Sequence, residues 1–254
     1  MAERLDSTAA LVTGASSGIG EATALALAKA GASVALVARR RDRLDELAAR
    51  VRATGVGALA IEVDVTDEEQ ARGAVARAAA EFGRLDTVVN NAGVMLLGPI
   101  VDAETSEWSR MIDLNVTGLL HVTHAALPHL IRAAESSPRR VADIVNVSST
   151  AGRIARLGSG VYNASKFAVN AFSESLRQEV TKRHVRVALV EPGAVATELA
   201  SHNKPQVQEM IRARFGETER LEADDIADAI AYIVTRPRRV AINEMLVRPT
   251  EQDM

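Results

Sequence analysis

The chain contains no cysteine, few aromatic residues and no long apolar run. The missing cysteine excludes disulfides, thiolate metal sites and cysteine nucleophiles. No apolar stretch approaches the roughly 20 residues that a membrane-spanning helix needs. The first ten residues, MAERLDSTAA, also lack the apolar segment of a secretory signal. We therefore expect a cytoplasmic protein with no membrane partner.

An excess of one charge is also missing. Lys and Arg number 30 and Asp and Glu 33, so the formal net charge is -3. This balance gives no overall attraction to nucleic acid or anionic lipid. Basic clusters at residues 39–43, 139–140 and 236–239 are short, as on ordinary solvated surface. No nucleic-acid partner is expected.

The chain does have enough apolar residues for one core, because 47% of its 254 residues are hydrophobic. No linker divides it, so the sequence predicts a single domain over residues 1–254. Continuously apolar runs of strand length alternate with longer segments of helical period, as in a parallel sheet covered on both faces. This pattern predicts a three-layer, doubly wound α/β fold. The runs span residues 9–13, 33–38, 58–63, 87–90, 142–147, 186–190 and 244–247.

Local signals separate the helices from these strands. Gly31 predicts the end of the first helix, and Thr66 with Glu69 predicts a capping box ahead of the third. Pro128 interrupts a long helical segment, and predicts a kink or a new helical turn beginning at His129. In such a fold the ligand binds at the carboxyl edge of the sheet.

Three glycines lie between the first strand and the first helix, in the segment TGASSGIG. Gly14, Gly18 and Gly20 would let backbone N–H groups approach a pyrophosphate at the positive end of the helix. Their spacing departs from G-x-G-x-x-G, and any tight turn favours glycine. A plain strand-to-helix turn therefore remains the alternative.

Two arginines end the second strand, roughly 20 residues beyond the glycines. NAD-binding proteins usually place an acidic residue there, which accepts hydrogen bonds from the ribose 2′-hydroxyl. Arg39 and Arg40 instead offer guanidinium groups that can bind a 2′-phosphate bidentately. The sequence therefore predicts NADP(H), with the start of a solvated helix as the alternative.

Polar and small residues close the next two strands. Asp64 and Val65 follow the third strand and are suited to the adenine edge, although Asp64 is equally suited to a helix cap. Asn91, Ala92 and Gly93 follow the fourth strand and would line the same groove, or form an ordinary turn.

A possible proton donor lies downstream, in the segment YNASK. Tyrosine has a reference pKa of about 10, so a neighbour must stabilise its phenolate. Tyr162 and Lys166 share one helix face at i and i+4, and a cation about 4 Å away is worth roughly 4 kcal/mol. Lys166 could therefore lower the tyrosine pKa by up to about three units, before desolvation opposes the change. The alternative is an ordinary surface pair.

These motifs together resemble the short-chain dehydrogenase/reductase family over nearly the full length. The chain contains the family's motifs in the family's order, namely TGASSGIG, NNAG, Asn115, Ser148-Ser149, YNASK and PGAVAT. Within that family the chain is most similar to NADP-dependent members of the clavulanic acid dehydrogenase kind, through NNAGVMLLGP, WSRMIDLN, FSESLRQEV and VRPT. It is next most similar to broad 3-hydroxy-acid and serine dehydrogenases. The resemblance implies a Rossmann-like sheet of about seven parallel strands. It also implies a homotetramer or homodimer built partly from the helices holding Asn115 and Tyr162.

The resemblance implies a catalytic tetrad of Asn115, Ser149, Tyr162 and Lys166. Tyr162 would protonate a carbonyl oxygen that Ser149 also holds, while NADPH delivers hydride to the carbon. Lys166 would bind the nicotinamide ribose, and Asn115 would hold a water that returns the proton. Taken singly, Asn115 is suited to a helix cap and Ser149 to a turn.

The predicted NADP(H) contacts combine these motifs with the segment PGAVAT, which resembles the part that receives the nicotinamide carboxamide. A plain loop is the alternative for that segment. The full set is Gly14, Ser16, Ser17, Gly18, Ile19, Gly20, Arg39, Arg40, Asp64, Val65, Asn91, Ala92, Gly93, Tyr162, Lys166, Pro192, Gly193, Val195 and Thr197.

The substrate pocket is predicted to comprise residues 95–99, 152–157 and 198–215, with a mobile lid around 196–216. Arg153, Arg156 and Lys204 fall in these segments and suggest an acidic substrate. Solvated basic residues are the alternative.

No metal site is predicted. His121 and His124 lie at i and i+3, but no third ligand has a suitable spacing and no HExxH occurs. Trp108, Met111 and Ile112 are interpreted as packing residues.

The sequence thus predicts an enzyme that reduces a small aldehyde or ketone to an alcohol with NADPH, reversibly. Two alternatives stay open. One is a 3-oxoacyl thioester reductase, and the other is a protein that senses NADP(H) without catalysis.

Overall fold

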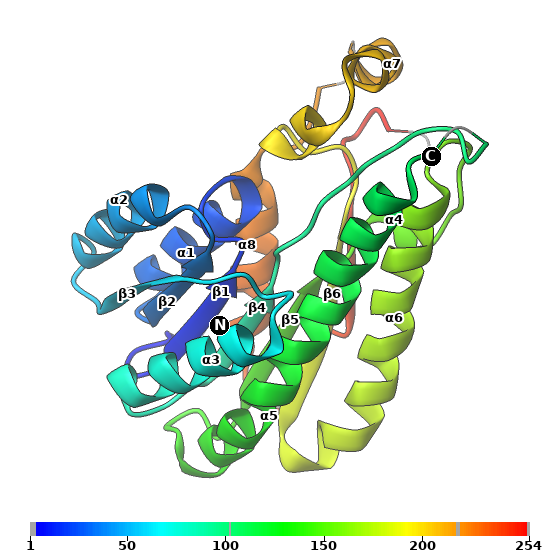
Figure 1. The fold of residues 1–254 in the computed structure, drawn as a ribbon. Helices are drawn as coiled ribbons and strands as arrows, with labels where there is room; N and C mark the ends of the chain where they lie inside the picture. The colour runs from blue at the N-terminus through cyan, green and yellow to red at the C-terminus, as the bar shows by residue number, and fades with distance from the viewer. Residues whose placement is uncertain (1–3, 102, 217–218, 253–254) are drawn as a thin grey trace.

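A seven-stranded parallel sheet forms the middle of the molecule in a computed structural model that describes residues 4–101, 103–216 and 219–252. The strand order is β3-β2-β1-β4-β5-β6-β7, so the order reverses between β1 and β4 (Figure 1). The strands are β1 (Ala9–Thr13), β2 (Ser33–Ala38), β3 (Ala58–Glu62), β4 (Thr87–Asn90), β5 (Ala142–Val147), β6 (Val185–Pro192) and β7 (Glu244–Val247).

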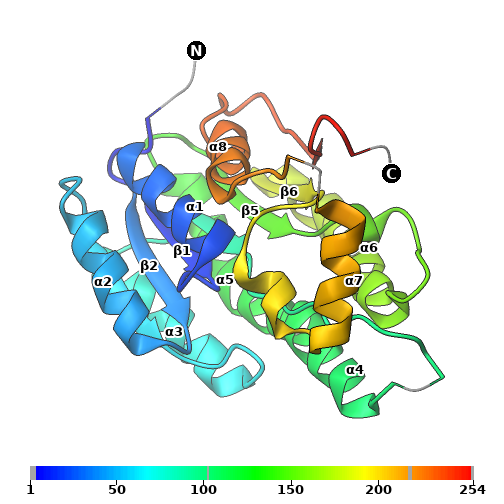
Figure 2. The same ribbon diagram turned by 90° about the horizontal axis from the view of Figure 1, so that it is seen from above.

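Helices cover both faces of the sheet, as Figure 2 shows from above. The α-helices are α1 (Gly18–Lys29), α2 (Arg41–Arg52), α3 (Glu68–Phe82), α4 (Thr105–Ile112), α5 (Gly118–Ser136), α6 (Gly160–Val180), α7 (Pro205–Phe215) and α8 (Ala223–Val234). A π-helical turn, η1 (Asp113–Thr117), joins α4 to α5. Short 3₁₀ helices occur at η2 (Thr150–Gly152), η3 (Thr181–Arg183) and η4 (Glu198–His202).

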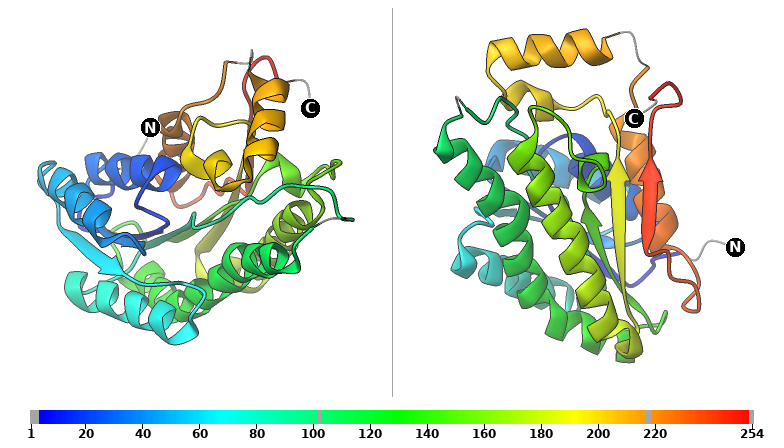
Figure 3. Two further views of the ribbon diagram at one scale, coloured as in Figure 1. Left: turned by 45° about the horizontal axis from the view of Figure 1, so that its top comes forward. Right: turned by 90° about the vertical axis from the view of Figure 1, so that its right-hand side faces the viewer.

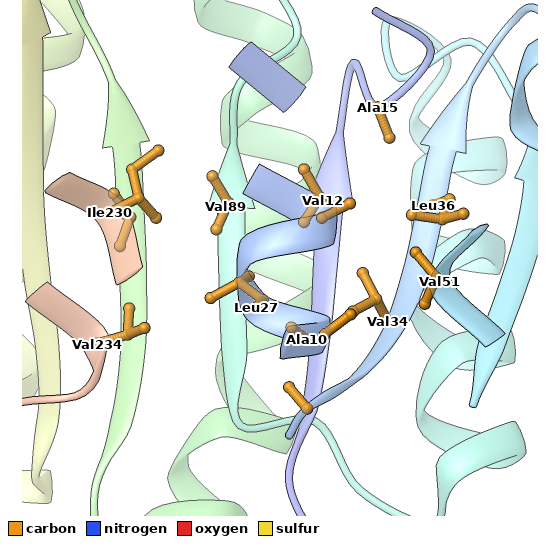
Figure 4. Close-up of a cluster of buried hydrophobic side chains, with 14 of the residues drawn as sticks. Ala10, Val12, Ala15, Leu27, Val34, Leu36, Val51, Val89, Ile230 and Val234 are labelled. Atoms are coloured by element: carbon orange, nitrogen blue, oxygen red, sulfur yellow. The ribbon is translucent and has the colours of Figure 1, made fainter. Parts of the chain in front are cut away.

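The core consists of two apolar layers, one on each face of the sheet. Val34 and Leu36 of β2 face α1, α2 and α8, whereas Ala35 and Val37 face α3, α5 and α6. Figure 4 shows part of the first layer, including Val34 and Leu36. Burial on both faces explains why the strands are continuously apolar, and it confirms the predicted doubly wound α/β class.

One predicted helix signal was wrong, although Gly31 does end the first helix with a positive φ of 110°. The third helix has Asp67 as its N-cap, and this carboxylate accepts a hydrogen bond from the backbone N–H of Gln70 at 2.9 Å. Thr66 is no cap, because its hydroxyl donates to Asp64 at 2.8 Å.

The chain also remains helical through Pro128. No new helix begins at His129, because α5 runs unbroken from Gly118 to Ser136. Buried residues on either side of the proline, Ala126 and Leu130, pack against the sheet and hold the helix together.

The carboxyl ends of the strands all point toward η4 and α7. Figure 3 shows β6 and β7 ending beneath these two short helices, which lie above the sheet. The predicted lid is therefore built of helices, and it covers the edge at which a doubly wound fold binds its ligand. Within the described ranges, no helix is both long and apolar enough to cross a bilayer.

Candidate active site

A single cavity of about 1080 Å³ lies between the carboxyl edge of the sheet and the lid. Its volume slightly exceeds the range of about 300–1,000 Å³ that is common for small-molecule sites. The ends of β1, β2, β3, β4, β5 and β6 all contribute residues to its wall. The cavity can therefore hold a long ligand together with a second small molecule.

The cavity brings together almost every predicted site residue. Of the predicted catalytic and cofactor set, Asn115 and Gly20 are outside its lining, and all the others contribute to the wall. Sequence motifs separated by more than 100 residues thus meet in one chamber.

Tyr162 is buried at the catalytic end of the cavity, beside Ser149. Burial raises the pKa of its phenol, and a hydrogen bond with Ser149 acts in the opposite direction. The Ser149 hydroxyl also accepts a hydrogen bond from the backbone N–H of Ala151 at 3.1 Å, which makes the predicted turn. Burial therefore favours the neutral phenol of Tyr162 over the phenolate.

The pKa of Tyr162 is raised in this structure and not lowered, because burial outweighs the interactions that favour the phenolate. Its ammonium lies 5.9 Å from the centroid of the tyrosine ring and donates a hydrogen bond to the Val147 carbonyl at 2.9 Å. Burial lowers the pKa of Lys166 itself to about 8. The cation lies close enough to stabilise a phenolate that forms during reaction, but desolvation dominates at rest.

Asn115 acts behind the cavity wall, inside the π-helical turn. Its side chain accepts a hydrogen bond from the Val94 N–H at 2.8 Å and donates to the Val94 carbonyl at 2.9 Å and to Ser165 at 3.1 Å. It is no helix cap. No sequence signal indicated the π turn, although such turns are frequent at functional sites.

The glycine turn leaves the first turn of α1 open to the cavity. A Cβ on Gly20 would collide with the carbonyl oxygen of Gly14, so the helix can approach the strand this closely only with glycine there. Ser17 is the N-cap of α1 but makes no side-chain cap. The backbone N–H groups of that first turn are therefore available to an anion.

The NNAG segment braces this turn. The Asn91 side chain donates to the carbonyls of Thr13 and Gly14 at 3.0 and 3.3 Å. The Thr13 hydroxyl in turn accepts from the backbone N–H groups of Asn91 and Ala92, each at 3.0 Å. The segment is thus more than an ordinary turn, because it fixes the glycine loop against β4.

The Arg40 side chain contacts the glycine turn. Its guanidinium donates to the hydroxyls of Ser16 and Ser17 at 3.1 and 2.7 Å, and it bonds to Glu198 of the lid at 3.0 Å. No sequence pattern indicated Glu198 as the partner of Arg40. Arg39 is more exposed and lies 3.8 Å from Asp64.

The remaining predicted contacts line the wall and also make local hydrogen bonds, but Asp64 is not the helix cap that was its alternative, because Asp67 caps α3. Asp64 accepts hydrogen bonds from the N–H and hydroxyl of Thr66, as a turn residue does. Gly193 donates its N–H to the Val247 carbonyl at 2.7 Å, which joins the PGAVAT segment to β7.

Two of the three basic residues predicted to attract an acidic substrate do not face the cavity. Arg153 points away and binds the buried carboxylate of Glu191, with its Nε at 2.8 Å, and also Glu244. Lys204 binds Glu104 at 2.8 Å and Glu107 at 3.3 Å.

The third predicted residue, Arg156, lines the cavity. Arg220 and Gln252, which the sequence did not single out, line it as well.

The lid is attached to the loop after β4 through Asn203. This buried side chain accepts a hydrogen bond from the Leu97 N–H at 2.7 Å and donates to the Met95 carbonyl at 2.9 Å. This contact explains why η4 lies against the loop after β4. The mobility of the lid remains a prediction.

No histidine belongs to a metal cluster among the described residues, and two of the three predicted packing residues pack beside Tyr162. Among the described residues, no group of three His, Asp or Glu side chains could hold a metal ion. Met111 and Trp108 pack beside Tyr162, as predicted, but Ile112 is 37% exposed and is not a packing residue.

Burial of Lys166 should reduce the stability of the fold. Because its pKa is lower in the folded protein than the unfolded value of 10.5, the ammonium costs up to about 3 kcal/mol below pH 8. That cost disappears as the pH rises to 10.5. We predict that Lys166→Met raises the melting temperature at pH 7 and that the gain shrinks between pH 8 and 10.5. Lys29→Met, at an exposed site, should show no such trend. A lower melting temperature for Lys166→Met at pH 7 would contradict this.

Comparison with known proteins places this geometry in a family. Residues 8–208 match the family model described as short chain dehydrogenase. The chain is 39% identical over 251 residues to the glycine betaine reductase ATRR of Emericella nidulans, covering 98% of this chain and 19% of that protein. It is 37% identical over 240 residues to an uncharacterized oxidoreductase of Staphylococcus epidermidis, covering 94% of this chain and 96% of the relative.

Solved structures agree with this assignment. The closed form of serine dehydrogenase complexed with NADP+ superposes with a TM-score of 0.88 at 31% identity, covering 97% of each chain. An alcohol dehydrogenase from the archaeon Thermococcus sibiricus, complexed with 5-hydroxy-NADP, gives 0.86 at 28% identity, covering 97% of this chain and 98% of that one. Fold, cavity and sequence together show that the chain belongs to the short chain dehydrogenase family of oxidoreductases.

Proposed function

We propose that this protein reduces a small aldehyde or ketone to an alcohol, reversibly, with NADPH as the hydride donor. The observation that carries the proposal is the shared cavity. Ser149, Tyr162 and Lys166 line the same chamber as the glycine turn and Arg40. A proton donor and a dinucleotide site are therefore close enough to act on one carbonyl group.

The residues fit a dinucleotide without rearrangement of the backbone. Gly20 keeps the α1 N-terminus close to β1, and its open N–H groups suit a pyrophosphate. Arg40, with Ser16 and Ser17 beside it, suits a 2′-phosphate, and Arg39 adds a second positive charge. NADP-complexed relatives agree with this preference.

The chemistry of the residues follows from their environment. NADPH, when bound, supplies hydride to the carbonyl carbon. Tyr162 gives its proton to the carbonyl oxygen while Ser149 holds that oxygen by a hydrogen bond. The tyrosine becomes a phenolate, which the Lys166 ammonium stabilises from 5.9 Å to the centre of the ring, and a solvent proton then restores the phenol. Because burial raises the pKa of Tyr162, the resting site is prepared for reduction.

Removing the phenol should abolish turnover and leave cofactor binding intact. General acid catalysis is worth about 10²–10⁴-fold, so we predict that Tyr162→Phe loses at least about 100-fold in kcat. The assay is NADPH oxidation with a panel of aldehydes, ketones and acyl thioesters, with NADPH binding measured by fluorescence. Tyr232→Phe is the matched control, because this second tyrosine is 48% exposed. Full activity in Tyr162→Phe would refute the proposed role. Binding of NADPH by the parent without turnover of any compound would favour a sensing protein.

Glu198 should compete with the 2′-phosphate for Arg40. The carboxylate bonds to Arg40 at 3.0 Å, and this contact lowers the pKa of Glu198. Exposed pairs of this kind contribute about 0.2–1 kcal/mol, so we predict that Glu198→Gln tightens NADPH binding by about two- to fivefold and leaves NADH binding unchanged. Glu209→Gln, at an exposed position of α7, is the control. Weaker NADPH binding in Glu198→Gln would mean that the carboxylate orients Arg40 instead of competing with the phosphate.

A betaine-type substrate is a second candidate, because of the relative that is named glycine betaine reductase. This chain spans only 19% of that protein. Quaternary ammonium groups are usually bound in cages of aromatic rings. Among the described residues of the cavity wall, Tyr162 is the one aromatic side chain apart from the imidazole of His202, and Arg156 and Arg220 add positive charge. The cavity therefore favours a neutral or anionic carbonyl compound.

We also propose that the chain forms a homo-oligomer through the outer face of α5 and α6. Half of the residues that line a shallow groove there are apolar, namely Leu120, Leu127, Phe172 and Leu176, and Phe167 is 44% exposed on α6. Light scattering at micromolar concentration should give a dimeric or tetrameric mass, and Phe167→Glu should reduce it. A mass of 27.0 kDa for the parent chain would rule this out.

A further inference from the structure

Arg220 lies in the segment between α7 and α8 and contributes to the cavity wall. Its neighbour Leu221 pairs with the segment that follows β6, donating to the Ala194 carbonyl at 3.0 Å and accepting from the Ala196 N–H at 2.7 Å. Leu221 packs into the core layer of α1 and α8. Because successive side chains of an extended segment point to opposite sides, Arg220 faces the cavity and contributes to its wall.

This segment lies beside the chain that follows the end of β6, and Ser149 contacts that end. The Ser149 hydroxyl lies 3.5 Å from the Pro192 carbonyl, and Ala194, which pairs with Leu221, is only two residues further along. The wall that Ser149 and Tyr162 line therefore also contains the Arg220 side chain, in addition to Arg39 and Arg40 at the glycine turn.

No carboxylate of the cavity wall is available to Arg220. Among its described residues, the acidic ones are Asp64 and Glu198, and these lie against Arg39 and Arg40. Arg220 makes no hydrogen bond or ion pair with any residue in the described ranges. A half-buried arginine on a cavity wall, with no partner among the described residues, is suited to an anionic ligand group.

We propose that Arg220 binds a carboxylate, or a comparable anionic group, on the carbonyl substrate, so that the substrate class is oxo acids. This inference rests on the proposed reductase function. It replaces the earlier expectation for Arg153 and Lys204, whose charges are bound by glutamates outside the cavity. The planar fork of arginine would hold the carboxylate by two hydrogen bonds and fix which carbonyl of the substrate meets Tyr162.

The test compares two probes that differ only in charge, succinic semialdehyde and its amide. For Arg220→Gln we expect the KM of the acid to rise about 10- to 100-fold, with the amide changed less than about twofold. Arg220→Lys should lie between, because it keeps the charge and loses the fork. Arg212→Gln is the matched control, since Arg212 is exposed on α7 outside the cavity wall. Equal loss of acid and amide in Arg220→Gln, or equal effects of the two glutamine variants, would overturn the proposal.

A binding measurement separates this inference from the reductase function. With NADP+ present, succinate should raise the melting temperature of the parent protein and not of Arg220→Gln, and succinamide should raise neither. This result supports the anion site even if no carbonyl is reduced. Turnover of acid and amide with equal efficiency by the parent would refute the anion site and leave the reductase function intact. Loss of NADPH affinity in Arg220→Gln at an unchanged acid-to-amide ratio would assign Arg220 to the cofactor and also overturn the proposal.

Discussion

The geometry of the site depends on the hydrogen bonds of the Asn115 side chain. It pairs with both backbone groups of Val94 and with Ser165, so it joins the loop after β4, the π turn and α6. Ser165 in turn donates to the carbonyl of Tyr162 at 2.8 Å. Loss of this amide would leave the N–H and C=O of Val94 buried without partners, which costs about 1–3 kcal/mol for each group. The same contacts position Tyr162 and Lys166 on α6 relative to the sheet edge.

Near Asn115 the protein buries a charged and a polar side chain, Lys166 and Tyr162, where apolar side chains would give a more stable core. Lys166 is buried with a pKa of about 8, and the phenol of Tyr162 is buried with a raised pKa. Both shifts come mainly from desolvation, which opposes ionisation at rest. The site is thus less stable than an apolar one of the same shape, as is common where residues are held for chemistry and not for packing. The large apolar layers on both faces of the sheet provide the stability that offsets this cost.

The sequence was sufficient for the fold and most of the site because those features are local. Strand runs, the glycine turn and YNASK are patterns of neighbouring residues, and parallel strands necessarily bring their carboxyl ends to one edge. The pairings across the chain were not predictable, because nothing in a sequence shows which acid meets which base. Arg153 therefore gave a wrong prediction, since Glu191 lies 38 residues away. Glu198 was missed as a partner of Arg40 for the same reason, across 158 residues. The role of Arg220 depends on the direction of one side chain, which only the structure gives.

The proposed reaction requires that one chamber hold a hydride donor and a carbonyl compound beside Tyr162. The most direct measurement is isotope transfer, with NADPH that carries deuterium at both C4 positions and any carbonyl compound that the protein consumes. Mass spectrometry of the product alcohol should find one deuterium, bonded to the former carbonyl carbon, with the hydroxyl proton taken from solvent. Oxidation of the labelled NADPH with no deuterium in the product would contradict direct hydride transfer in this cavity.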